Sequence, residues 1–129
     1  MKIVVDSSII IDYLRGGEKW DDFIFAAEDE QDPQLFLPTI VIFELYSGTS
    51  TRSIKKLQEM SYFISHFERI DLNEHIAMLA GELSRDASHR IQAPDYIIAA
   101  SALSINATVL TLNQKHFEQI PNINLYPLP

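Results

Sequence analysis

The sequence predicts an α/β domain built on a parallel sheet of four to five strands with helices on both faces. Short apolar runs that suit strands alternate along the chain with segments of helical periodicity, which is typical of parallel sheets with right-handed crossovers. The chain has 129 residues and is 47% hydrophobic, enough for one ordinary globular core. No repeat, low-complexity tract or linker interrupts it, so we expect a single domain over residues 1–129.

The strands are expected in short apolar or β-branched runs bounded by residues that break regular structure. Four runs are clear: KIVV at 2–5, LFL at 35–37, ATVLT at 107–111 and INLY at 123–126. A weaker fifth run, FERID, occupies 67–71. These runs are the four to five strands of the expected sheet.

Helical patterns fill the segments between the strands. The clearest is NEHIAMLAGELSRDA at 73–87, where apolar residues recur at helical spacing behind Asn73 as a cap. In PTIVIFELYSG the β-branched run at 39–42 favours a strand by propensity alone. Pro38 and Gly48 nevertheless suit a helix start and stop, and LFL already supplies the preceding strand, so we expect a helix.

The composition excludes several classes of function. Without cysteine the chain has no disulfide framework, no thiolate zinc site and no cysteine nucleophile. The N-terminal stretch MKIVVDSSIIIDYLRG lacks a small-residue cleavage site, and no run approaches the ~18 apolar residues of a membrane span. We therefore expect a cytoplasmic protein that does not enter a membrane.

The charge balance is acidic, with ten Lys and Arg against eighteen Asp and Glu and a net charge of −8. This balance argues against broad electrostatic binding to nucleic acid or to anionic membranes. Three basic residues, Arg52, Lys55 and Lys56, cluster in TSTRSIKKLQ. A solvated helix face is the default interpretation of this cluster, and contact with an RNA backbone is the minority one.

Three carboxylates occupy positions that a parallel sheet brings to one edge, since ligands of such sheets bind beyond the carboxyl ends of the strands. Asp6 ends the first strand and opens the helix of DSSIIIDYL, where it also suits a cap. Glu44 is the one charged residue between Phe36 and Arg52. Burying the Glu44 carboxylate without a partner would cost several kcal/mol. Glu44 therefore needs a partner, an exit to solvent or a metal. Asp95 follows a proline at the start of the helix in IQAPDYIIAASALSI, where complementing the helix dipole is worth ~0.3–1 kcal/mol without any catalytic role.

If these carboxylates converge, they require a cation. At about 4 Å each pair repels by ~1 kcal/mol in water and by ~4 kcal/mol at an effective dielectric constant of about 20. Hard divalent ions with oxygen ligands, Mg²⁺ or Mn²⁺, suit such a group of acids. Such ions activate water and neutralise charge on a phosphodiester during in-line attack.

Four segments, IVVDSSIIIDYL, PTIVIFELYSG, PDYIIAASAL and ATVLTLNQKHF, occur in an order and spacing that resembles the PIN-domain family. The likeness runs from residue 2 to residue 126 and is strongest to the small VapC-type ribonuclease toxins of type II toxin–antitoxin systems. It implies a PIN-like fold and an acidic site of Asp6, Glu44 and Asp95 that holds Mg²⁺ or Mn²⁺ and cleaves RNA. It also implies a homodimer and a cognate antitoxin whose C-terminal segment covers the site. From the sequence, FIFAAE and LYSGTS are candidate contact regions because they look exposed.

The fourth segment departs from the family pattern. Family members carry Thr, then Asn, then an acid just before Phe, whereas TLNQKHF keeps Thr111, Asn113 and Phe117 but has His116 in place of the acid. Imidazole is a poor ligand for Mg²⁺ and a better one for Mn²⁺ or Zn²⁺. Three interpretations stay open: the fourth position is dispensable, Asn113 supplies the polar contact, or the site is weakened. Asn113 and His116 therefore join the candidate catalytic residues.

Other functions with a similar alternation lack their own signatures. A phospho-receiver domain would have two adjacent acids after the first strand, where VVDSS has one. Nucleotide-binding domains need a glycine-rich loop, which the four glycines do not form, and a serine hydrolase needs G-x-S-x-G. The remaining alternative is a catalytically weak PIN-like module that binds RNA or protein, which His116 suggests. We expect a metal-dependent endoribonuclease.

Overall fold

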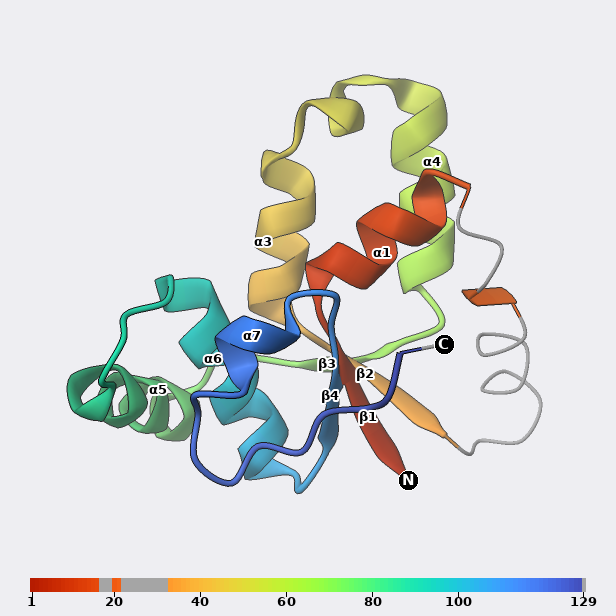
Figure 1. The fold of residues 1–129 in the computed structure, drawn as a ribbon. Helices are drawn as coiled ribbons and strands as arrows, with labels where there is room; N and C mark the ends of the chain where they lie inside the picture. The colour runs from red at the N-terminus through yellow and green to blue at the C-terminus, as the bar shows by residue number, and fades with distance from the viewer. Residues whose placement is uncertain (17–19, 22–32, 129) are drawn as a thin grey trace.

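A parallel four-stranded sheet lies at the centre of the computed structural model, which describes residues 1–16, 20–21 and 33–128 (Figure 1). The strands are β1 (Lys2–Val5), β2 (Gln34–Pro38), β3 (Glu68–Ile70) and β4 (Thr108–Leu110). They lie in the order β3-β2-β1-β4, and every pairing is parallel. Ile3 of the central strand β1 pairs with Leu35 on one side and with Thr108 on the other. The carboxyl ends of all four strands therefore meet at one edge of the sheet.

Four of the five expected strands are confirmed, including the weaker FERID segment as β3. The expectation of a strand over INLY was wrong, because residues 123–126 run beside β4 and form only a single bridge to Val109. Asn122 turns the chain with a φ of 68° just before this segment. Pro127, just after it, has no N–H with which to extend a ladder. These two residues limit the segment to one point of pairing.

The helices fall between the strands as the alternation predicts. They are α1 (Ser7–Leu14), α3 (Thr39–Ser47), the 3₁₀ helix η2 (Thr49–Arg52), α4 (Ile54–Ile64), α5 (Glu74–Asp86), α6 (Ala93–Ser104) and α7 (Gln114–Phe117). The ambiguous β-branched segment is a helix as expected, since β2 ends at Pro38 and Gly48 is the C-cap of α3. Asn73 caps α5 as expected, and its Oδ1 accepts a hydrogen bond from the Ile76 N–H at 2.9 Å.

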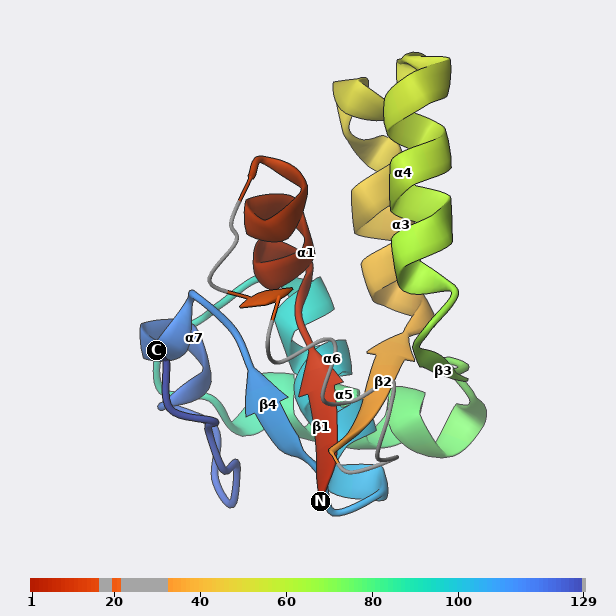
Figure 2. The same ribbon diagram turned by 90° about the vertical axis from the view of Figure 1, so that its right-hand side faces the viewer.

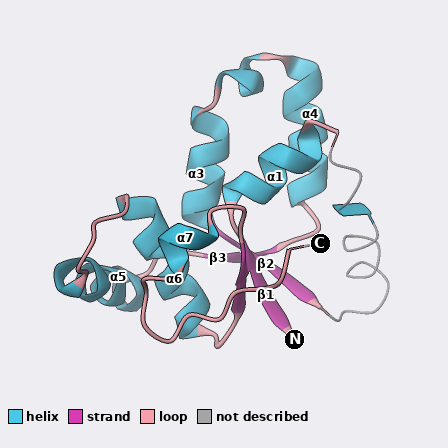
Figure 3. Cartoon of the chain, in the orientation of Figure 1, coloured by secondary structure: helices cyan, strands magenta, loops and turns pink. Residues whose placement is uncertain are grey.

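The helices divide into two groups around the sheet. In Figure 2, α5 and α6 lie behind the strands, whereas α1, α3 and α4 rise beyond the arrowheads. Figure 3 shows the same division, with α1, α3 and α4 standing over the magenta strands. Stacked rings of Tyr13 and Phe63, with centroids 4.2 Å apart, join α1 to α4. The expected α/β fold is confirmed, and among the described helices none combines the length and apolar character that a bilayer crossing requires.

Small side chains bring α6 close to the sheet. Residues 3–5 of β1 are fully buried, and α6 packs against β1 and β4. Ala99, Ala100 and Ala102 on α6 have no exposed surface. A helix with alanines on its buried face approaches its neighbours closely, and this packing fixes the position of the first turn of α6.

An acidic candidate active site at the carboxyl ends of the strands

Asp6 follows the last residue of β1 and is almost fully buried, with 2% of its surface exposed. Its N–H donates to the Leu110 carbonyl of β4 at 3.0 Å. It caps α1, because Oδ1 accepts from the Ser7 N–H at 2.8 Å. Its Oδ2 accepts from two hydroxyls, Ser8 Oγ at 2.9 Å and Thr111 Oγ1 at 2.7 Å. Capping and a role in the site are therefore compatible for Asp6, since the same donors orient its carboxylate.

The two hydroxyls that reach Asp6 also join separate segments, and we refer to Ser8 and Thr111 as the hydroxyl clamp. Thr111 is fully buried, and its Oγ1 accepts from the Asn113 N–H at 2.9 Å. Ser8 Oγ accepts from the Leu112 N–H at 3.0 Å. The clamp thus ties the start of α1 to the chain that follows β4. The sequence did not predict this role, because Thr111 stood out only as part of the family pattern and Ser8 only as a residue suited to a helix cap.

Glu44 projects from α3 and is half-buried. The Ser7 hydroxyl lies between two carboxylates, 3.3 Å from Glu44 Oε1 and 3.4 Å from Asp6 Oδ1. Burial and the negative charges of Asp6 and Asp95 raise the pKa of Glu44 from 4.5 to about 7, against the opposing hydrogen bond from Ser7. Of the three alternatives named for Glu44, a hydrogen-bond partner and partial exposure are present, and its raised pKa reflects burial first and then repulsion by Asp6 and Asp95.

Asp95 lies in the first turn of α6, and its side chain is 13% exposed. The N-cap of this helix is Gln92, and no side chain makes a capping hydrogen bond there. Asp95 Oδ2 lies instead 3.2 Å from Nδ1 of the half-exposed His116 on α7. Burial and the charge of Asp6 raise the pKa of Asp95, while His116 opposes both effects. The side chain of Asp95 is thus engaged with the site and caps nothing.

The three carboxylates, here called the acidic cluster (Asp6, Glu44 and Asp95), come from three elements and repel one another. Asp6 acts on both of the others, and Asp95 acts on Glu44. Within the described residues, no three His, Cys, Asp or Glu side chains form a ready-made ligand set for a metal ion. Mg²⁺ usually keeps several waters and takes only one or two carboxylates directly. The acidic cluster thus does not form a direct ligand set, and its oxygen donors and mutual repulsion suit a hard cation that keeps its waters.

The last two candidate residues lie at α7. Asn113 is the N-cap residue of α7, but its side chain makes no capping hydrogen bond. It contributes through its backbone N–H, which donates to Thr111. His116, by contrast, contacts Asp95 directly. The structure thus brings His116 to the acidic cluster and leaves the Asn113 side chain without a bond to it.

Comparison with known proteins agrees with this architecture. A PIN-domain family model matches residues 3–123. The chain belongs to the PIN-domain family. This PIN domain is 32% identical over 123 residues to Ribonuclease VapC19 of Mycobacterium tuberculosis, which covers 93% of the chain and 95% of that relative. It is 37% identical over 95 residues to Ribonuclease VapC2 of Rickettsia felis, which covers 69% of the chain and 70% of the relative.

Two solved structures share the fold of this PIN domain over nearly its full length. A chain of VapBC2 from Rickettsia felis, bound to a DNA fragment from its promoter, is 27% identical with a TM-score of 0.82 and covers 100% of both chains. A chain of DNA-bound VapBC from Salmonella typhimurium is 25% identical with a TM-score of 0.83 and covers 98% of this chain and 97% of that one. The resemblance of the four sequence segments to VapC-type PIN domains is thereby confirmed.

Proposed function

We propose that this PIN domain is a metal-dependent endoribonuclease that hydrolyses RNA phosphodiester bonds and acts as the toxin of a toxin–antitoxin pair. The observation that carries the proposal is the convergence of three carboxylates at the carboxyl ends of parallel strands, with the pKa of Glu44 raised to about 7. The names of the relatives, which are VapC ribonucleases, support RNA as the substrate. RNA as substrate implies a cytoplasmic site of action.

The acidic cluster is the proposed site for one or two Mg²⁺ or Mn²⁺ ions. Its donors are oxygens, which these hard ions prefer, and its mutual repulsion is what a cation would offset. When bound, such ions supply water activation and charge neutralisation for phosphodiester hydrolysis. No protein nucleophile is required.

Each side chain of the site has a distinct part in this proposal. The hydroxyl clamp and the Ser7 N–H hold the Asp6 carboxylate in one orientation. Glu44 is partly protonated near neutral pH without a cation, and its carboxylate ionises fully once a positive charge offsets Asp6 and Asp95. His116 Nδ1 lies within hydrogen-bonding distance of Asp95 Oδ2. The other carboxylate oxygen of Asp95, Oδ1, is then available to a ligand.

Cleavage of single-stranded RNA by the purified chain tests the proposal. We expect cleavage in Mg²⁺ or Mn²⁺, its loss in EDTA, and no cleavage by Asp95→Asn prepared in the same way, which controls for contaminating nuclease. The alternative is a catalytically weak module that binds RNA or protein, favoured by His116 in the position of the family's acid. RNA binding without cleavage in either metal would establish that alternative and refute the enzyme.

A cognate antitoxin and a homodimer complete the proposal. The chains of similar structure belong to VapBC assemblies. Of the two contact regions expected from the sequence, LYSGTS forms the end of α3 and the start of η2, where Tyr46 is exposed. FIFAAE lies outside the described residues. Light scattering of the purified chain over a range of concentrations tests the homodimer, and an unchanging monomer mass would refute it.

A further inference from the structure

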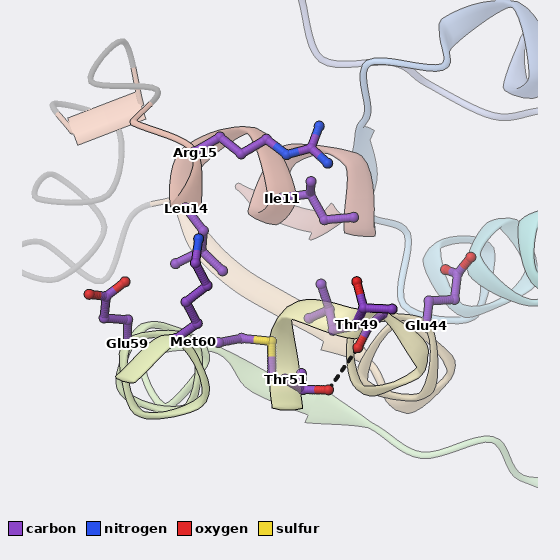
Figure 4. A pocket seen from close by; sticks show the side chains of 11 residues that line it. Ile11, Leu14, Arg15, Glu44, Thr49, Thr51, Glu59 and Met60 are labelled. Carbon is purple, nitrogen blue, oxygen red and sulfur yellow. Dashed lines mark hydrogen bonds between the residues drawn. The ribbon is translucent and has the colours of Figure 1, made fainter. Parts of the chain in front are cut away.

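A pocket of about 260 Å³ opens directly beside the acidic cluster, between α1, α3, η2 and α4 (Figure 4). Its apolar lining comes from three helices: Ile11 and Leu14 of α1, Leu45 of α3 and Met60 of α4. Glu44 also lines it. Because Glu44 belongs to both the pocket and the acidic cluster, a molecule seated in the pocket is contiguous with the proposed site of cleavage.

Two cations from different helices line the same pocket. Arg15 is the C-cap residue of α1, and Lys56 lies in the first turn of α4. Both are exposed, and among the described residues neither forms an ion pair. Figure 4 shows Glu59 on the side of the pocket away from Glu44. These two cations, which come from two helices, can bind an anion in the pocket, whereas Glu44 and Glu59 in the same lining oppose it.

We propose that this pocket is a subsite for single-stranded RNA next to the scissile bond. Arg15 and Lys56 bind backbone phosphates, and the apolar lining contacts a nucleotide base. The proposal rests on the proposed ribonuclease function, because it assigns the pocket to the substrate of the adjacent acids. It refines the minority interpretation of the basic cluster: Lys56 lines the pocket, and Arg15, remote from that cluster in sequence, joins it.

The position of the pocket favours RNA over a protein segment as the occupant, and Arg15 and Lys56 supply contacts for phosphates. The substrate of a nuclease must lie against the catalytic acids, and this pocket includes one of them. Single-stranded nucleic acid is bound by cationic grooves that follow the backbone and by side chains that contact the bases. Glu59 lines the same pocket and repels phosphate. Removing its charge should therefore tighten the binding of RNA.

Binding of a fluorescein-labelled oligouridine, measured by anisotropy in EDTA over a series of KCl concentrations, tests the subsite. Each phosphate contact on a single strand contributes about −0.7 to the slope of log K against log salt concentration, so Arg15→Ala with Lys56→Ala should make that slope shallower by about 1.4. The matched control is Lys2→Ala with Arg90→Ala, which removes two charges at exposed positions, on the amino end of β1 and just before α6. Glu59→Gln should tighten binding.

One further double variant and one kinetic readout separate the outcomes. Arg15→Lys with Lys56→Arg keeps both charges and should retain the parent slope, which excludes a folding defect as the cause. In metal, the double alanine variant should raise KM by a larger factor than it lowers kcat.

Three outcomes would contradict part of this scheme. If the parent cleaves RNA but the double alanine variant and its matched control have equal slopes, the subsite is refuted and the ribonuclease proposal is not. RNA binding that depends on Arg15 and Lys56, without cleavage, would refute the nuclease instead. Unchanged RNA binding with weakened binding of the cognate antitoxin would overturn the subsite and assign the pocket to that partner.

Discussion

Glu44→Gln tests the acidic cluster by keeping the shape of one member and removing its charge. The amide oxygen still accepts the hydrogen bond from the Ser7 hydroxyl, but repulsion by Asp6 and Asp95 ends. Because the pKa of Glu44 is raised from 4.5 to about 7 on folding, the folded protein holds this proton more tightly than the unfolded chain does. The stability that Glu44 contributes is therefore present below about pH 4.5 and is lost as the pH rises through 7.

The size of this effect follows from the shift in pKa. A change from 4.5 to about 7 corresponds to roughly 3 kcal/mol at 1.36 kcal/mol per unit, and solvent screening around a half-buried carboxylate reduces it to about 1–2 kcal/mol. At pH 8 without metal, Glu44→Gln should therefore unfold with a free energy about 1–2 kcal/mol higher than the parent. For a domain of this size the corresponding rise in Tm is about 3–8 °C.

Urea and thermal unfolding in EDTA at pH 5 and pH 8 measure the effect. The advantage of Glu44→Gln should be small at pH 5 and full at pH 8, and Glu68→Gln, at an exposed position on β3, should show neither. Saturating Mg²⁺ should then stabilise the parent more than Glu44→Gln, because only the parent has all three charges to neutralise. A variant that is less stable than the parent at pH 8, or an advantage independent of pH, would refute the reasoning.

Three further substitutions test the remainder of the site. Asp95→Asn removes one charge and keeps the shape at the start of α6, so cleavage should be lost with both Mg²⁺ and Mn²⁺, and full activity would show that the acid is not a ligand. His116→Asp places an acid beside Asp95 and should raise kcat/KM in Mg²⁺ more than in Mn²⁺, since nitrogen suits the softer ion; equal rates for variant and parent in both metals would make His116 a bystander. Thr111→Val nearly preserves the buried volume but takes one donor from Asp6 and the acceptor from the Asn113 N–H. We expect it to lower the free energy of unfolding by ~1–3 kcal/mol and to reduce kcat, and an unchanged urea midpoint with parent activity would contradict the role of the hydroxyl clamp.

The sequence by itself determined the local elements and named the candidate acids. Pro38 and Gly48 predicted the helix α3 despite its β-branched start, and Asn73 predicted the cap of α5. Such signals depend on neighbours a few positions apart and on periodicity, both of which are visible in the chain. The prediction of a strand over INLY was wrong for a physical reason. Apolar character shows only that a segment suits a sheet, whereas the backbone at Asn122 and Pro127 limits how far this segment pairs with β4.

Only the tertiary structure decided how the acids are held and what surrounds them. Thr111 donates to Asp6 across 105 positions of sequence, and the raised pKa of Glu44 comes from burial and from two charges on other elements. The contact between Asp95 and His116 likewise became evident only in the folded chain. The physical reason is that hydrogen bonds, desolvation and repulsion depend on distances in space. A parallel sheet sets those distances by bringing together strand ends that lie far apart in the sequence.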